Sequence, residues 1–290
     1  MIQSDQFFLE GADVESGYEA IRTAPHHTAA RDHVETLWSR YKHLADSHFR
    51  TDARKHFHQR FWEMYLACSL LDRGIALQRW GGAGPDYYFE ADGRRIWIEA
   101  VAPSQGTGPD QVPEIEYGTV SLVPTDGIVL RLTSAIHDKR QKMEEAVAKG
   151  IIAPHDPVIL AVNSRGIPHA CIERTIPYIV KAVLPFGALA VSIDRDTQAI
   201  VESFHKFEPT IVKSNQSSVS KEAFLNPDYA RFSGIISSAV NCVSYPQRLG
   251  DDFLFLHNPT AMYSLSDHQF HWCKQLKYDD GELIEIEPEV

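Results

Sequence analysis

Paired cysteines are absent from this sequence. The cysteines are few and far apart: Cys68, Cys171, Cys242 and Cys273. Their spacing excludes a CxxC centre and gives no disulfide framework, which is typical of a protein in a reducing compartment. Long apolar runs are also missing, since the longest, residues 178–193, is too short to span a bilayer and is interrupted by Lys181 and Pro185. The N-terminus lacks an apolar signal core. We therefore expect a soluble, cytoplasmic protein without membrane contact.

An excess of positive charge is missing as well. The 290 residues have a net charge of −11 and a pI near 5.7, so a strongly basic surface for nucleic acid is not expected. Contact with DNA or RNA would need a local basic patch or bound metal cations. Acidic residues are concentrated near the C-terminus, where residues 279–289 are expected to form a solvated or frayed end. No P-loop, GxGxxG, GxSxG or HExxH motif occurs.

The spacing of apolar residues predicts helices first and then strands alternating with helices. Helices are predicted over 28–48, 52–73 and 134–149, and 172–183 is expected to be partly helical. Strands are predicted over 75–79, 86–90, 95–101, 127–132, 158–162, 188–193, 232–240 and 252–256. This alternation indicates an α/β fold, with a central mixed β-sheet flanked by helices. Because the composition shifts nowhere, we predict a helical N-terminal elaboration over 1–50 and one α/β domain over 51–290, irregular towards its C-terminus.

Two apolar elements each contain an isolated carboxylate. The helix around Glu63 is apolar almost all the way round, which indicates a buried helix. Glu99 is the only charge in the apolar strand 96–101, which reads as buried on both faces. A buried carboxylate is costly unless a partner compensates it. Both glutamates are therefore candidates for a functional site.

A third carboxylate is expected beside Glu99. The dipeptide Asp92-Gly93 predicts a hairpin turn, which would place Asp86 opposite Glu99 across two paired strands. Facing carboxylates repel each other unless a cation lies between them. Oxygen ligands of this kind suit Mg²⁺ or Mn²⁺.

These residues resemble the motif of the PD-(D/E)XK nuclease superfamily, which has restriction-endonuclease-like folds. Its members place a glutamate on an early core helix, a Pro-Asp pair at the start of one strand and a (D/E)-x-K triplet on the next. The corresponding residues here are Glu63, Pro85-Asp86 and Glu99-Ala100-Val101. The resemblance covers 57–162, about half of the chain at most.

The resemblance implies a metal-dependent nuclease that hydrolyses phosphodiester bonds of DNA or RNA. Asp86, Glu99 and the backbone carbonyl of Ala100 would hold Mg²⁺ or Mn²⁺, and Glu63 would bind the cation directly or through water. The sequence departs from the family at Val101, where the family has a lysine that positions or activates the attacking water.

Some members of the family supply the lysine from a neighbouring helix. Lys139 and Lys142, on the predicted helix 134–149, are the candidates here. The alternative is that both are ordinary exposed lysines of that helix.

Two other functions remain open. The chain could be a catalytically degraded member of the family that binds nucleic acid or a protein partner, which Val101 and the negative net charge favour. It could instead be an unrelated α/β protein that binds a small ligand. In that case Glu63 and Glu99 would pair with buried arginines such as Arg60 or Arg131.

Overall fold

The structure, a computed structural model, describes residues 5–116, 118–172 and 176–289. Its α-helices are α1 (Ser16–Thr23), α2 (Thr28–Tyr41), α3 (Phe49–Ala53), α4 (Phe57–Asp72), α5 (Thr125–Ala148) and α6 (Tyr178–Val183). Its strands are β1 (Gln78–Arg79), β2 (Tyr87–Ala91), β3 (Arg94–Val101), β4 (Val158–Asn163), β5 (Phe186–Ile193), β6 (Ile200–Phe207), β7 (Thr210–Val212), β8 (Ser218–Ser220), β9 (Phe232–Ser238), β10 (Leu254–His257), β11 (Lys274–Asp279) and β12 (Glu282–Ile286).

The fold is α/β with a large mixed central sheet, as predicted. Within the described residues this sheet has eight strands in the order β1-β2-β3-β4-β9-β10-β11-β12. The first three strands form an antiparallel meander, whereas β3, β4 and β9 run parallel to one another. Every residue of β4 is buried, which agrees with the continuous apolar run in its sequence.

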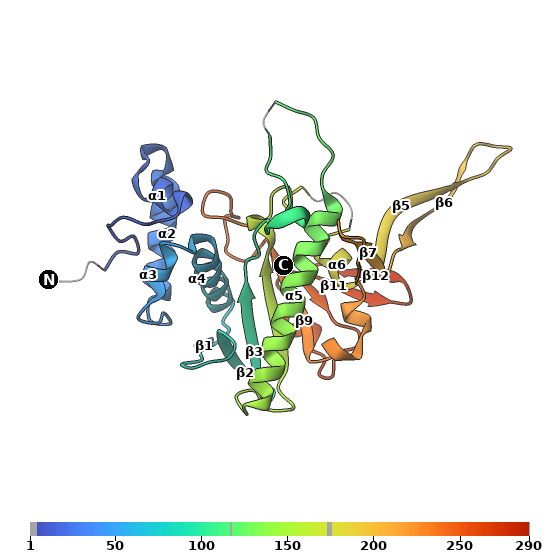
Figure 1. The fold of residues 1–290 in the computed structure, drawn as a ribbon. Coiled ribbons are helices and arrows are strands. Elements are labelled where there is room, and N and C mark those ends of the chain that lie inside the picture. The colour runs from blue at the N-terminus through green and yellow to red at the C-terminus, as the bar shows by residue number, and fades with distance from the viewer. Residues whose placement is uncertain (1–4, 117, 173–175, 290) are drawn as a thin grey trace.

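Helices cover both faces of this sheet (Figure 1). Alternate side chains of a strand point to opposite faces, and β3 shows the consequence. Ile96 and Ile98 lie in a core shared with α4 and the N-terminal helices α1–α3. Trp97 and Val101 pack instead in a second core with α5 and α6. Strand β3 therefore separates the two cores, with α4 on one side and α5 on the other.

Helix α5 is longer than predicted, and the strand predicted over 127–132 is wrong. These residues are the first turns of α5, where Ile128, Val129 and Leu132 are buried in the second core. A short apolar run has no period that distinguishes a buried helix from a buried strand.

Two helix boundaries also differ from the prediction. The helix predicted over 28–48 ends at Tyr41, and the helix predicted over 52–73 is interrupted by residues 54–56 between α3 and α4. The predicted strand 75–79 is reduced to the two residues of β1.

The acidic C-terminal region is paired in strands and is therefore not frayed, although residues 279–289 are mostly exposed, in agreement with the solvated end that was the other predicted possibility. Strands β11 and β12 form an antiparallel hairpin, and β11 pairs in parallel with β10. Gln275 and Leu276 are buried in this addition to the central sheet. The strand predicted over 188–193 exists as part of β5, but it pairs with β6 in a separate hairpin outside the central sheet. Among the described residues, no helix is long and apolar enough to cross a membrane.

Candidate functional site

The candidate site lies where β2 begins beside the C-terminal half of β3. Asp86 is one step before the cross-strand pair Tyr87–Ile98, which places it opposite Glu99. Its Oδ2 accepts a hydrogen bond of 2.8 Å from the backbone N–H of Ala100. The N–H and C=O of one residue point to the same side of a strand. The carbonyl of Ala100 therefore also points to the side where β2 no longer provides a partner.

A tight approach of the chain fixes the position of Asp86. Gly84 has φ +148°, and a Cβ added there would lie 2.9 Å from Ile151 Cγ2 and 3.0 Å from Trp80 Cδ1. A larger residue would be both strained and crowded at this point. The carbonyl of Asp86 accepts a backbone hydrogen bond of 3.3 Å from the N–H of Trp80. The glycine-rich turn thus holds the start of β2 close to Ile151, just after the C-terminal end of α5.

Glu63 lies on α4, which covers the face of the sheet opposite to α5. Its side chain is buried, and Arg60 Nη1 donates to both carboxylate oxygens at 2.8 and 3.1 Å. Burial, followed by the charge of Asp86, raises the pKa of Glu63 to about 7, although Arg60 and Gln59 act in the other direction. The pairing of Glu63 with Arg60 is the one that the small-ligand alternative expected.

Glu99 points to the α5 face, and its partner is Lys139. The Nζ of Lys139 forms an ion pair with Oε1 of Glu99, and both side chains are largely buried. Val101 lies two residues further along β3, on the same face as Glu99. A lysine at position 101 would therefore project towards the side from which Lys139 enters. The structure brings a lysine to this side of the strand from the neighbouring helix.

The charges of this group influence one another. Burial and the charge of Asp86 raise the pKa of Glu99 to about 7, against the effect of Lys139. Burial also raises the pKa of Asp86, and this outweighs the Ala100 N–H and the nearby cations. Burial lowers the pKa of Lys139, but the charges of Glu99, Asp86 and Glu63 outweigh burial and raise it. The four side chains thus form one electrostatic unit, as coupled acidic and basic groups at functional sites often do.

Some of the oxygen atoms at this site are suitable ligands for a hard divalent cation. Among the described residues, no hydrogen bond or ion pair involves the second oxygen of Asp86 or of Glu99. With the carbonyl of Ala100, these oxygens give three donors of the kind that Mg²⁺ or Mn²⁺ prefers. No group of three His, Cys, Asp or Glu side chains in the described part of the chain is arranged to hold a metal ion. The expected ligand Glu63 is instead bound to Arg60 and Gln59.

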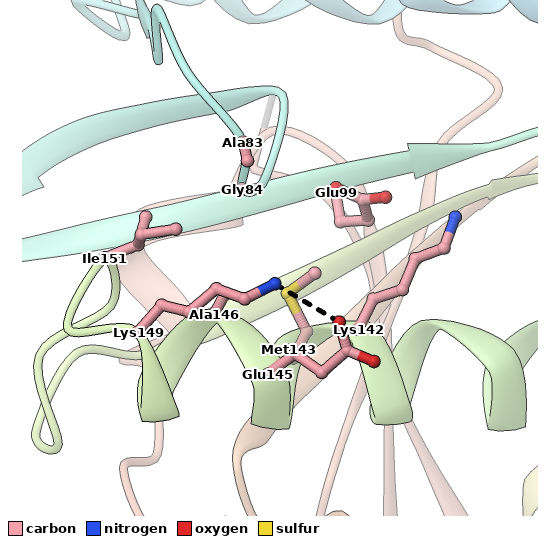
Figure 2. A pocket seen from close by; sticks show the side chains of 9 residues that line it. All are labelled: Ala83, Gly84, Glu99, Lys142, Met143, Glu145, Ala146, Lys149 and Ile151. Atoms are coloured by element: carbon pink, nitrogen blue, oxygen red, sulfur yellow. Dashed lines mark hydrogen bonds and ion pairs between the residues drawn. The ribbon is translucent and has the colours of Figure 1, made fainter.

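Lys142 lines a pocket next to this group. The pocket has a volume of about 280 Å³ and lies between α5 and the glycine-rich turn, with Glu99 at one end (Figure 2). Figure 2 shows Lys142 extending towards the level of Glu99, while Lys149 lies further along α5 and pairs with Glu145. The charge of Lys142 also lowers the pKa of Glu99. Lys142 is thus near the group but makes no ion pair within the described residues.

Gln59 is a residue of the site that the sequence analysis missed. Its Oε1 accepts a hydrogen bond of 2.7 Å from the N–H of Ala102, and its Nε2 donates to Glu63 at 3.0 Å and to the Ala100 carbonyl at 3.4 Å. It therefore connects α4 with the end of β3. The available signal was its spacing, since Gln59 precedes Glu63 by four residues and shares its helix face.

Arg131 is not part of the group. Its Nε donates to the carbonyl of Ser104 at 3.0 Å, so the pairing with Glu99 that the small-ligand alternative allowed does not occur. Lys139 takes that place. Comparison with known proteins gave no match to any family model, curated protein or solved structure.

Proposed function

We propose that this chain is a metal-dependent nuclease that hydrolyses phosphodiester bonds of DNA or RNA, in the manner implied by its resemblance to the PD-(D/E)XK superfamily. One observation carries the proposal. Lys139, from α5, reaches Glu99 on the face of β3 where the motif has Val101. The residue missing from the triplet thus has a substitute of the same chemistry.

Each residue of the group has a distinct role in this proposal. Asp86, Glu99 and the carbonyl of Ala100 would hold Mg²⁺ or Mn²⁺, which supplies charge compensation for the phosphate and lowers the pKa of a water. Lys139 places a positive charge at the phosphate and orients the attacking water. Lys142 lines the adjacent pocket and its charge lowers the pKa of Glu99, and in this proposal it would bind a neighbouring phosphate.

Glu63 acts through its neighbours in this scheme. Arg60 holds its carboxylate, and Gln59 links it to the carbonyl of Ala100. A set of two carboxylates and one carbonyl leaves room for water and phosphate oxygens, and Mg²⁺ usually keeps several such ligands. The donor set therefore supports a cation that is completed by substrate.

A cleavage assay with matched variants tests the proposal. Purified protein would be incubated with single- and double-stranded DNA and RNA in Mg²⁺, Mn²⁺ or EDTA. We expect cleavage that needs the cation and that Glu99→Gln and Lys139→Met each reduce by at least about 100-fold, the scale of losing one electrostatic group. Arg140→Met removes a positive charge from the next position of α5, where Arg140 pairs with Glu144, and should keep full activity.

The outcomes separate the alternatives. If no substrate is cleaved in any cation, the nuclease proposal is wrong. Nucleic-acid binding without cleavage would then favour the catalytically degraded alternative. Cleavage that Lys139→Met leaves unchanged would remove Lys139 from the mechanism.

A further inference from the structure

The β5–β6 hairpin carries an uncovered apolar face. It forms its own two-stranded sheet and extends away from the rest of the molecule (Figure 1). Six large apolar side chains along it are about half exposed or more: Leu189 55%, Val191 49%, Ile193 54%, Ile200 67%, Val201 69% and Phe207 71%. Such a concentration differs from the isolated exposed apolar residues that are normal on a protein surface.

The register of the hairpin places these side chains together. Leu189 lies opposite His205, and Val191 lies opposite Ser203, so odd-numbered positions of both strands share one face. A register shift near the turn brings Ile193 opposite Ile200. This apolar face of the hairpin therefore extends from its base to its tip.

The opposite face of the hairpin is more polar. Ser192 and Glu202 form a cross-strand pair there, and Lys206 lies two positions beyond Phe204 on the same side. This face also carries Phe204, which is 43% exposed, but most of the exposed apolar side chains lie on the other face, so the hairpin is amphipathic. An isolated two-stranded hairpin is marginally stable in water and needs packing against another element.

We infer that the apolar face of the β5–β6 hairpin is a dimerisation surface that packs against the same face of a second copy of this chain. Two features favour a second copy as the partner. The strand positions of this face are Leu189, Val191, Ile193, Val201, Ser203, His205 and Phe207, with no Asp, Glu, Lys or Arg among them, while the charged Asp194, Arg195 and Asp196 lie in the turn. The face therefore matches a surface that is also without acidic or basic side chains, and a two-fold axis supplies one. At these exposed fractions the six side chains expose on the order of 600 Å² of apolar surface, most of the ~800 Å² of total surface that each partner buries in a stable interface.

The charge of the chain fits this geometry. Two copies with a net charge of −11 each repel one another if their bodies approach closely. Contact through a projecting hairpin keeps the two bodies apart while it buries the apolar face. This arrangement is independent of the proposed nuclease activity.

Sedimentation equilibrium of the full chain tests the inference. We expect the wild type to be a dimer and Val191→Lys to weaken the dimer about 100-fold, since each interface then contains two buried lysines and each costs about a factor of ten or more. Ser192→Lys adds the same charge one position away, on the opposite face, and should remain dimeric. Circular dichroism should show both variants folded, because both positions are exposed.

Three results would overturn the inference: a wild type that is monomeric at all attainable concentrations, a Val191→Lys variant that remains dimeric, and loss of the dimer in both lysine variants. If the monomeric wild type also floats with phosphatidylcholine vesicles, the apolar face is assigned to a lipid surface instead.

Discussion

Replacing Lys139 by methionine is expected to destabilise the folded chain and to abolish cleavage by separate effects. The variant keeps the length of the side chain but leaves Glu99, which is 6% exposed, without its cation and next to Asp86. Removing one partner of a buried ion pair costs about 3–5 kcal/mol. Because Lys139 and Glu99 retain some access to water, we take the lower value, about 3 kcal/mol. For a chain of this size, that is a fall in Tm of roughly 6 °C.

Thermal unfolding with and without Mn²⁺ measures this effect. In the absence of metal, Lys139→Met should unfold earlier. Arg140→Met, which breaks a pair with the half-exposed Glu144 and a cation–π contact with Tyr229, should lower Tm by less, about 2–4 °C. Mn²⁺ should stabilise Lys139→Met more than the wild type, since a cation between Asp86 and Glu99 replaces the lost charge. The variant should still fail to cleave. A Lys139→Met variant as stable as the wild type, with no added response to Mn²⁺, would refute the coupling of these side chains.

Three further predictions concern the surroundings of the site. Gly84→Ala should lower the free energy of unfolding by about 1–3 kcal/mol, measured by urea denaturation, because the new Cβ meets Ile151 and the backbone favours glycine. Gln59→Leu should lose more cleavage activity than its loss of folded protein explains, because the Ala102 N–H and the Ala100 carbonyl at the end of β3 lose their hydrogen bonds to Gln59. A variant as active as the wild type would contradict that role. Burial lowers the pKa of His58 to about 4, below its ordinary 6.5, so the folded chain binds fewer protons than the unfolded chain between these values. The free energy of unfolding should therefore fall as the pH drops from about 6.5 to 4, by up to ~3 kcal/mol for this histidine. Over the same pH range, the urea midpoint of His58→Gln should fall less than that of the wild type.

Parts of the fold and of the candidate site were predictable because local patterns specify them. The apolar helix α4 and the apolar strand β3 were recognised from their sequences, and so was the facing of Asp86 and Glu99, through the Asp92-Gly93 turn. These features depend on neighbours in sequence. The same local patterns were misleading at 127–132, where α5 buries an apolar run that also fits a strand.

Other parts depend on contacts between distant segments. Whether Lys139 reaches Glu99 follows from how α5 packs on β3, which no spacing within 134–149 determines. Arg60 and Gln59, the partners of Glu63, are close to it in sequence, so this part of the site was accessible to local patterns. The hydrogen bond from the Ala102 N–H to Gln59 joins residues 43 positions apart, and no local pattern predicts it. The strand β12 could not be predicted from its acidic sequence because its pairing with β11 outweighs its composition.

The position of β4 in the sheet has a consequence for biosynthesis. Its two neighbours are β3, which ends at Val101, and β9, which ends at Ser238. During translation, the chain up to Asn163 already contains every residue of the candidate site, yet β4 then has one unpaired edge. An unpaired edge of a strand whose residues 158–162 are all apolar is prone to aggregate, and pairings between distant segments form slowly. The nascent protein therefore depends on the arrival of residues 232–238, long after its site residues are made, to close the sheet and protect it from self-association.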